Sequence, residues 1–311
     1  MTPLAPRLAA ALELIAVSAD CRTGRVNGRE VSAGSAAALR HKLGQEIYAE
    51  LHVGHRRETP AGPGFSRDEK FEADLLAVTP HRYLTREVPI LGEDGDDFRV
   101  EMEGVKVRLP RAHVTGPPDR VAGRLVCRVP ATRPALSPGF FVAEGSHRRG
   151  EHDPLLRVYV HLRTRVAAIA AWAAVLGWLE HNRIGYQAKV SSAAELLPRR
   201  DGLVLYLPVQ HCDVVPVIAG LMAGLDGVGA QVSVFAERVG PGVAIAHEPD
   251  DPRPGMRGLS FGEHRAQALA AGLVQHAQAA HTGSVTSAVR RSLLDARIDP
   301  ANPACNVPGT A

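Results

Sequence analysis

The sequence predicts an α+β fold with a helical and β-hairpin N-terminal half and a C-terminal half of mixed helices and strands. Apolar residues recur at helical spacing in two early segments, and an alternating strand pattern replaces that spacing from Tyr83 to Glu144. From Leu155 onward, short apolar runs typical of buried strands surround a long helical segment. Helices followed by runs of strands favour an α+β arrangement over a parallel α/β one.

The first half contains three expected helices and a series of expected strands. Helical periodicity covers residues 5–18 and 36–51, and a third helix is expected from Phe71 to Val78 after a Pro/Gly-rich loop. The stretch FRVEMEGVKVRLPRAHV alternates around a Glu-Gly turn, which predicts a half-exposed hairpin. GRLVCRVP and SPGFFVAEG predict further strands. The charged segment 146–154 predicts a boundary between domains 1–150 and 151–311.

The second half begins with strand, helix, strand, strand between residues 155 and 207. Later segments predict a helix at 214–225, strands in QVSVFAERV and GVAIAHEP, and helices beginning near Glu263 and Ser284. The Pro-rich tail after Asp299 is expected to fray.

Composition limits the function classes. A 311-residue chain with 45% hydrophobic residues can bury a full core, and its net charge of +3 is too small for general nucleic-acid binding. The N-terminus lacks a signal peptide and no apolar run is long enough to span a bilayer, so we expect a cytoplasmic protein without membrane contact. No nucleotide, hydrolase or metalloprotease motif occurs, and no cofactor is expected.

Two histidines lie three residues apart at the end of the second expected helix. His52 and His55 have a spacing that can bind metal, but no carboxylate or third ligand belongs to the motif. The sequence therefore predicts no metal site.

His161 ends the first strand of the second half. Side chains alternate along a strand, so Arg157, Tyr159 and His161 share one face. A histidine among apolar neighbours is either a hydrogen-bonded structural residue or a proton-transfer group.

Lys189 is the only lysine in the last two hundred residues; the other lysines are Lys42, Lys70 and Lys106. Arginine replaces lysine readily on a surface, but arginine cannot accept a proton because its pKa stays above about 12. The alternatives are a lysine kept for its titratable amine and a chance survivor in an arginine-preferring sequence.

Arginines near two of these segments are candidate anion ligands. Arg199 and Arg200 precede an expected strand, and Arg265 lies in the first turn of the helix after Ser260-Phe261-Gly262. A helix N-terminus beside an arginine can bind an anion, and ordinary capping by Ser260 is the alternative. For Arg199, surface solvation is the alternative.

Two C-terminal stretches carry a resemblance to a known family. KVSSAAELLPRRDGLVLYLP and GVAIAHEPDDPRPGMRGLSFGEHRAQALA resemble the HopA effector family of type III secretion, and resemble still more the lyase components of class V lanthipeptide and related modified-peptide (RiPP) biosynthesis. GQEIYAELHVGH and LSPGFFVAEG extend the resemblance over most of the chain. The resemblance implies a lyase-like α+β C-terminal half and possible peptide recognition by the N-terminal half.

The resemblance also implies an activity and partners. Such lyases eliminate phosphate from phosphoserine or phosphothreonine of a ribosomal precursor peptide, leaving dehydroalanine or dehydrobutyrine. The implied partners are the precursor peptide, with its leader and phosphorylated core, a separate phosphotransferase, and a cyclase.

The order of polar residues is similar to that in effector phosphothreonine lyases, which implies roles for six residues of this chain. Elimination needs a base, an acid and cations for the phosphate, and it needs no metal. Lys189 is the expected base and His161 the expected acid, and the strands that carry them are expected to be neighbours in one sheet. The expected phosphate ligands are Arg200, Arg199, Arg265 and Tyr159. Tyr159 stands where those lyases have a second lysine.

Two other function classes remain open from the sequence. One is a non-catalytic peptide- or partner-binding module, and the other is a phosphatase-like hydrolase. The mass of the product separates elimination from hydrolysis, because elimination leaves the peptide one water lighter than its unmodified form and hydrolysis restores the original mass.

Overall fold

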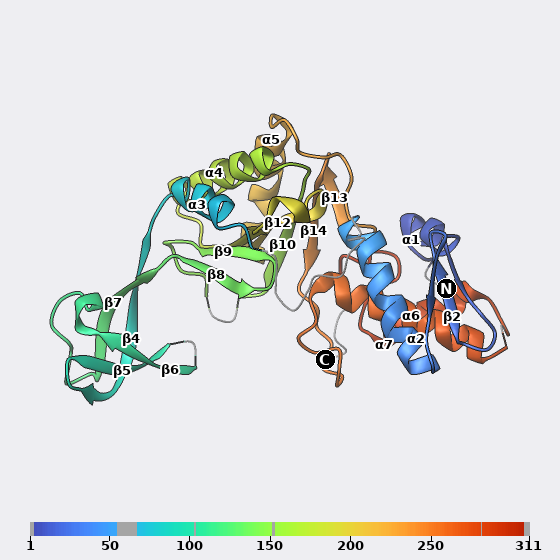
Figure 1. Ribbon diagram of the computed structural model, residues 1–311, viewed down its shortest axis with the longest axis horizontal. Coiled ribbons are helices and arrows are strands. Elements are labelled where there is room, and N and C mark those ends of the chain that lie inside the picture. The colour runs from blue at the N-terminus through green and yellow to red at the C-terminus, as the bar shows by residue number, and fades with distance from the viewer. Residues whose placement is uncertain (1–2, 55–66, 103, 151–152, 281, 308–311) are drawn as a thin grey trace.

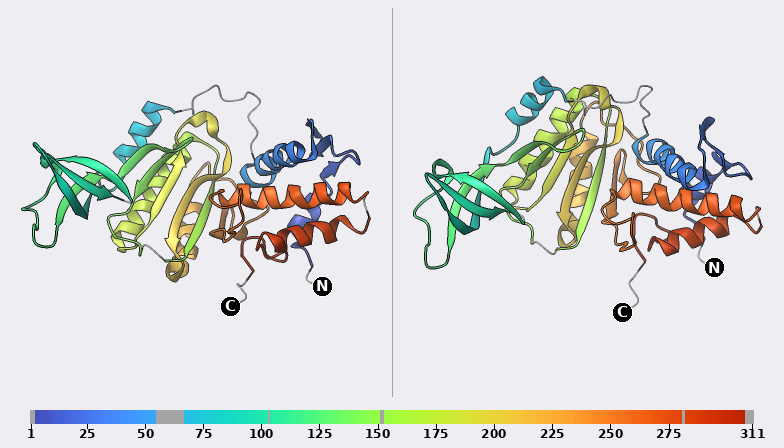
Figure 2. Two further views of the ribbon diagram at one scale, coloured as in Figure 1. Left: turned by 90° about the horizontal axis from the view of Figure 1, so that it is seen from below. Right: turned by 60° about the horizontal axis from the view of Figure 1, so that its bottom comes forward.

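The computed structural model describes residues 3–54, 67–102, 104–150, 153–280 and 282–307, and it confirms the α+β class (Figure 1). Within these residues the strands form three antiparallel sheets: a small N-terminal sheet, a four-stranded sheet and a central seven-stranded sheet. Figures 1 and 2 show the four-stranded sheet at one end, the central sheet in the middle and a helical layer at the other end.

The N-terminal segment differs from the single long helix expected at residues 5–18. Helix α1 ends at Leu12, and β1 then pairs with β2 through Ile15 opposite Val26. The β-branched residues Ile15 and Val17 suit a strand better than a helix, so pairing replaces the helical pattern. The elements here are α1 Pro6–Leu12, β1 Ile15–Val17, β2 Thr23–Val26 and β3 Arg29–Ser32.

The second helix, α2 Ala36–Ile47, continues directly into a π-helical turn, η1 Tyr48–Val53. Ser35 caps α2 because its hydroxyl accepts a hydrogen bond from the amide of Ala38 at 3.2 Å. The next described helix, α3 Glu69–Ala77, agrees with the expected third helix and begins at the capping residue Asp68.

The four-stranded sheet has the order β6-β5-β4-β7 and a core of its own that includes Phe98, Val100, Leu125 and Cys127. The expected hairpin forms its β5 and β6 strands. The elements are β4 Tyr83–Asp94, β5 Asp97–Met102, β6 Val105–Pro110, the 3-10 turn η2 Arg111–His113 and β7 Arg124–Pro130.

The central sheet has the order β13-β14-β10-β12-β11-β9-β8, with antiparallel neighbours throughout. The strands that carry Lys189 and His161 were expected to be neighbours. They are not, because β12 lies between them. The strands are β8 Thr132–Ser137, β9 Phe140–Glu144, β10 Leu155–Leu162, β11 Gln187–Ser191, β12 Arg199–Pro208, β13 Glu237–Gly240 and β14 Val243–His247.

Helices cover one face of the central sheet, and the other face meets η1 and the start of a helical layer that extends away from the sheet (Figure 1). On one face, α4 Arg165–His181 and α5 Val215–Ala223 bury a core that includes Val158, Val160 and Trp172. On the other, α6 Phe261–Gln278 packs with α2 and α7 Val285–Asp295 around a second core that includes Tyr159 and Val204. Alternation along β10 therefore directs Val158 and Tyr159 to different cores.

The expected boundary near residue 150 does not separate two folding units. Strand β9, before that point, pairs with β11 after it through Val142 opposite Lys189. Helix α2 likewise packs against α6. The central core is assembled from both halves of the chain.

Two further expectations are corrected near the C-terminus. Of QVSVFAERV only the last residues join a strand, β13, while the preceding segment crosses to η1 through the amide of Val234 and the carbonyl of Leu51. The tail after Asp299 is packed through residue 307, since Ile298 pairs with Asn306 and Ala304 is buried. The remaining short turns are η3 Ala194–Leu196 and η4 Val209–Val214. No helix among the described residues is long and apolar enough to cross a membrane.

Candidate functional site

Three adjacent strands place Lys189 on the sheet face turned toward α6 and η1. Lys189 of β11 lies opposite Val204 of β12, and Val204 lies opposite Tyr159 of β10. Because directly opposed residues of antiparallel strands share a face, all three point to the same side. Tyr159 and Val204 belong to the core beneath α6, so Lys189 lies at the border of that core.

The Lys189 ammonium group lies between two aromatic rings. Its nitrogen is 4.4 Å from the centroid of Phe140 and 5.8 Å from that of Tyr206. Lys189 is half-buried, and it makes no hydrogen bond or ion pair with the described part of the chain. An ammonium group between rings is attracted to their faces, and Asp201 is near enough to interact with it electrostatically although no ion pair joins the two.

Arg199 shares the Phe140 ring with Lys189 and is held by a carboxylate. The Arg199 guanidinium carbon lies 5.0 Å from the Phe140 centroid. Its Nε and Nη2 donate to the two oxygens of Asp201 at 2.8 and 2.9 Å. Burial alone would raise the pKa of Asp201, but the charge and hydrogen bonds of Arg199 hold it well below its usual range. This bidentate pair fixes the direction of the arginine fork.

Arg157 occupies the other side of Lys189 in the same way. Its guanidinium carbon is 5.0 Å from the centroid of Tyr206, and its Nε donates to Glu248 at 2.6 Å. Tyr159 is 3% exposed; Arg157 is near enough to interact electrostatically with its hydroxyl, but no hydrogen bond of good geometry joins the two groups. Burial raises the pKa of Tyr159 far above its ordinary value, so the hydroxyl stays protonated.

The π-helical turn η1 closes this site from above the sheet. His52 is 3% exposed, its Nδ1 bonds with the Ser233 hydroxyl at 2.9 Å, and its Nε2 is 3.9 Å from Asp201. Its ring packs edge-on against Tyr159 and stacks on Tyr48. Burial lowers the pKa of His52 to about 4, although Asp201 opposes that change. His52 is thus neutral near pH 7.

We call Lys189, Arg199, Arg157, Asp201, His52, Tyr206 and Phe140 the sheet-face cluster. It holds three cations, and its two nearest carboxylates, Asp201 and Glu248, are each committed to one arginine. Lys189 supplies the surplus positive charge. Rigid arginine forks beside an ammonium group that makes no ion pair with the described residues are suited to a small, multiply charged anion.

His161 does not join this cluster. It lies two residues beyond Tyr159 on β10, which places its Cα about 12 Å from that of Lys189 across two strand spacings. The ring packs on the backbone of Gly229, where an added Cβ would lie 2.1 Å from His161 Nδ1. Burial, and then Arg200, lower the pKa of His161, while the Gln231 backbone partly offsets them. Its expected pairing with Lys189 is therefore not formed in the structure.

Arg200 also points away from Lys189. Its Nη1 donates to the carbonyl of Glu50 at 2.9 Å, and its Nη2 donates to Gln231 at 3.1 Å. The structure therefore separates the two adjacent arginines among the expected ligands, leaving Arg199 in the sheet-face cluster and Arg200 beside His161.

Arg265 is a structural residue in the described chain. It is 0% exposed, and it donates to the carbonyl of Pro303 at 3.0 Å and to the side chain of Asn306 at 2.8 Å. Burial lowers its pKa to about 10. The helix N-terminus before it is capped reciprocally by Ser260 and Glu263, so the capping alternative is confirmed. Arg265 ties the C-terminal segment to α6; it is near enough to Arg157 to interact with it electrostatically, but its hydrogen bonds go to the C-terminal segment and His264.

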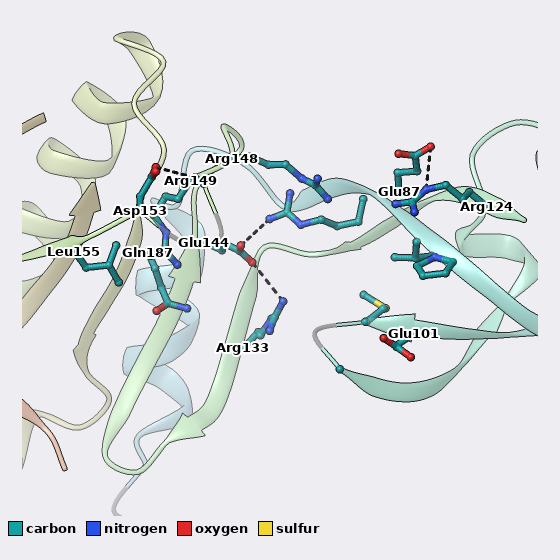
Figure 3. A pocket seen from close by; sticks show the side chains of 16 residues that line it. Glu87, Glu101, Arg124, Arg133, Glu144, Arg148, Arg149, Asp153, Leu155 and Gln187 are labelled. Carbon is teal, nitrogen blue, oxygen red and sulfur yellow. Dashed lines mark hydrogen bonds and ion pairs between the residues drawn. The ribbon is translucent and has the colours of Figure 1, made fainter. Parts of the chain in front are cut away.

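A cleft lies between the central sheet and the four-stranded sheet (Figure 3), and its described lining contains no member of the sheet-face cluster. Its volume is about 640 Å³, and its central-sheet wall contains Glu144 and Gln187, which face each other across β9 and β11. Gln187 is two residues before Lys189 and therefore on the same face. Glu144 pairs with Arg86 at 2.8 Å and Arg133 at 3.3 Å, and Figure 3 shows Arg148 and Arg149 nearby. The cleft is large enough for several residues of an extended peptide.

No group of three or more potential metal ligands occurs among the described residues. His55 lies outside them. His52 instead belongs to the hydrogen-bonded cluster with Ser233 and Asp201.

Several members of the sheet-face cluster were not predicted as site residues. Asp201 directly follows the two arginines, and Tyr206 lies further along the same strand, β12. The spacing of these residues does not by itself reveal that they lie near Lys189. His52 was considered only for metal, because its contact with Asp201 joins residues far apart in the chain. A charge pattern of Arg-Arg-Asp before a strand was the available signal for the Arg199–Asp201 pair.

Comparison with known proteins gives a family. The sequence pattern of the HopA1 effector protein family matches residues 131–305, which is more than half of the chain and includes the strands that carry the sheet-face cluster. Comparison with curated proteins found no match.

Two solved structures are similar to this chain. One is an effector protein from Pseudomonas syringae pv. syringae strain 61, with 16% identity, a TM-score of 0.48, and coverage of 88% of this chain and 97% of that one. The other is an effector protein from Pseudomonas syringae pv. tomato strain DC3000, with 15% identity, a TM-score of 0.45, and coverage of 86% and 97%. Because the pattern of the HopA1 effector protein family matches residues 131–305, more than half of its length, the chain belongs to that family.

Proposed function

We propose that this protein is a phosphoserine/phosphothreonine lyase that eliminates phosphate from a phosphorylated ribosomal precursor peptide, as in lanthipeptide-type biosynthesis. The observation that carries the proposal is Lys189. It is a half-buried lysine without a carboxylate partner, and it lies beside two arginines whose forks are fixed by Asp201 and Glu248. This arrangement offers a proton acceptor next to a phosphate site.

The residues of the cluster can share the work of a β-elimination. Once its ammonium group has given a proton to solvent, the Lys189 amine takes the Cα proton, the electron pair forms the Cα=Cβ bond, and the Cβ–O bond breaks. Arg199 and Arg157 stabilise the negative charge on the departing phosphate. The Lys189 ammonium then gives its proton to the phosphate, which leaves as hydrogenphosphate. His161 has no part in this scheme, because it lies across β12 and packs on Gly229.

His52 and Asp201 serve as positioning residues in the proposal. Asp201 holds the Arg199 fork, and His52 bonds with Ser233 of the segment that crosses above the sheet. Since His52 is neutral near pH 7, it does not add a further charge to the phosphate site. Neither residue is assigned a proton transfer.

The cleft of Figure 3 is the proposed path of the peptide on either side of the phosphorylated residue. Its lining residue Gln187 lies two residues before Lys189 on the same sheet face, and its far wall belongs to the four-stranded sheet. Glu87 and Glu144 pair with three of its arginines, so Arg148 and Arg149 are the ones offered to acidic residues of a peptide. Contacts remote from the reacting atoms allow one centre to act on several Ser/Thr sites.

The experiment is an intact-mass measurement after incubation of the purified protein with synthetic phosphothreonine and phosphoserine peptides. Elimination gives a peptide one water lighter than the unphosphorylated form, together with free inorganic phosphate. A product with the mass of the unphosphorylated peptide would show a phosphatase instead. A phosphopeptide that binds but returns unchanged, also when a precursor leader is fused to it, would support a non-catalytic peptide- or partner-binding module.

A further inference from the structure

A second basic cavity lies apart from the sheet-face cluster, between α1, the segment 230–234 and β13. Its volume is about 460 Å³, and its charged lining residues are Arg7, Arg200 and Arg238. No carboxylate is among its described lining residues. Glu50 is the acidic group near Arg200, and its carboxylate accepts a hydrogen bond from Asn27 at 2.7 Å.

Two of the three guanidinium groups are held by neutral acceptors. Arg7 Nη2 donates to the carbonyl of Val232 at 2.9 Å. Arg200 Nη1 donates to the carbonyl of Glu50 at 2.9 Å, and its Nη2 donates to the Gln231 side chain at 3.1 Å. These bonds fix the directions of the forks without neutralising their charge.

The wall of the cavity is fixed by backbone hydrogen bonds at three points. The Gly229 amide donates to the carbonyl of His161 at 2.8 Å, the Gly242 amide donates to Ala230 at 3.1 Å, and the Val234 amide donates to Leu51 at 2.9 Å. The cavity is therefore preorganised, and ligand binding need not order this segment.

A glycine makes the position of Arg200 possible. Gly54 has a φ of 73°, and a Cβ added there would lie 2.5 Å from Arg200 Nε. A side chain at this position would displace the guanidinium group. The glycine thus permits both the left-handed turn after η1 and the close approach of the arginine.

The electrostatics favour an anionic ligand. Burial, and then Arg238, lower the pKa of Arg7. Burial also lowers the pKa of Arg200; Glu50 opposes this change and Arg7 adds to it. Arg7 and Arg238 are exposed and Arg200 is half-buried, so the site is open to solvent. Because Arg7 repels each of the other two cations and no described lining residue is a carboxylate, the three would gain from a shared anion.

We propose that Arg7, Arg200 and Arg238 form a second anion site that binds a dianionic phosphate group. A phosphate group fits better than a carboxylate, because its three terminal oxygens can accept paired N–H donors from more than one guanidinium group. This site is independent of the proposed lyase function, since none of its three arginines belongs to the sheet-face cluster.

The test is a titration with inorganic phosphate at constant ionic strength, followed through the arginine Nε–Hε NMR signals of the full-length protein. The signals of Arg7, Arg200 and Arg238 should shift along one saturating curve. The double substitution R7Q/R238Q should weaken that binding by about tenfold or more for each arginine removed. The control R22Q/R25Q makes the same change in net charge on the exposed N-terminal hairpin and should leave the curve unchanged.

Three outcomes would overturn the inference. Shifts that fail to saturate and are matched by chloride would show an adventitious ion only. Equal affinity for acetate would exclude selectivity for phosphate. If only the NMR signals of Arg157 and Arg199 saturated, phosphate would bind at the proposed lyase site and the second site would be excluded. Because the wild-type signals are read directly, the result stands even if R7Q/R238Q fails to fold.

Discussion

The Lys189 ammonium nitrogen lies 4.4 Å from the centroid of Phe140, the ring that also lies 5.0 Å from the guanidinium carbon of Arg199. One aromatic side chain thus holds an amine that can accept a proton next to a guanidinium group that cannot. This asymmetry permits a direct test of which cation takes part in chemistry.

Replacing Lys189 by Arg should remove elimination while the protein stays folded. Arginine keeps the positive charge and the contact with Phe140 but cannot accept the Cα proton, so the rate should fall by about a hundredfold or more. Intact-mass analysis of a phosphothreonine peptide over time measures the rate. Lys70→Arg, on the exposed face of α3, is the control and should retain full activity. Comparable rates for Lys189→Arg and the wild type would exclude Lys189 as the base.

Replacing Asp201 by Asn should destabilise the fold and weaken phosphopeptide binding. The change leaves Arg199, whose side chain is 14% exposed, without its bidentate carboxylate. Removing one partner of a buried ion pair costs about 3 kcal/mol, because the remaining charge stays buried. Urea unfolding measures this cost. Asp94→Asn, at the exposed ion pair with Arg108, should change stability by less than about 0.5 kcal/mol. Equal losses for the two variants would contradict the buried-pair account.

Stability should fall between pH 7 and pH 5 through His52. Its pKa is about 4 in the folded protein and 6.5 ordinarily, so the unfolded chain takes up a proton over this range and the folded protein does not. Uptake by the unfolded state lowers the free energy of unfolding as pH falls, by about 2 kcal/mol at pH 5 for this one group. His264, whose pKa burial also lowers to about 4, adds a further loss of the same sign.

Urea unfolding at both pH values measures the His52 contribution. His52→Gln, which keeps a polar partner for Ser233, should reduce the pH-dependent loss, while His41→Gln on the exposed face of α2 should not. An unchanged pH dependence in His52→Gln would mean that His52 is not neutral in the folded protein.

Replacing Arg265 by Gln should act on stability and not selectively on phosphate binding. The substitution removes donors to the buried carbonyl of Pro303 and the half-buried side chain of Asn306, at a cost of about 3 kcal/mol. Titration with phosphorylated and unphosphorylated forms of one peptide should show equal changes for the two. Arg291→Gln, exposed on α7, controls for the loss of charge. A selective loss of phosphopeptide affinity would mean that Arg265 is a phosphate ligand and would contradict its structural role.

The sequence by itself determined the α+β class and most helices and strands, because periodicity and turn residues are local signals. It also singled out Lys189, the only lysine in the last two hundred residues, and Arg199, which with Arg200 precedes an expected strand. Local signals failed at residues 13–17, where pairing between β1 and β2 overrides a helical pattern. They failed again at Arg265, whose partners Pro303 and Asn306 are about forty residues away.

Only the tertiary structure decided which polar groups share a site. Inserting β12 between β10 and β11 separates His161 from Lys189 and brings Arg199 and Asp201 beside the lysine instead. His52 reaches Asp201 from a turn about 150 residues earlier in the chain. Strand order and long-range packing set these distances, and they depend on which apolar faces bury one another, a choice that residue spacing along the chain does not encode.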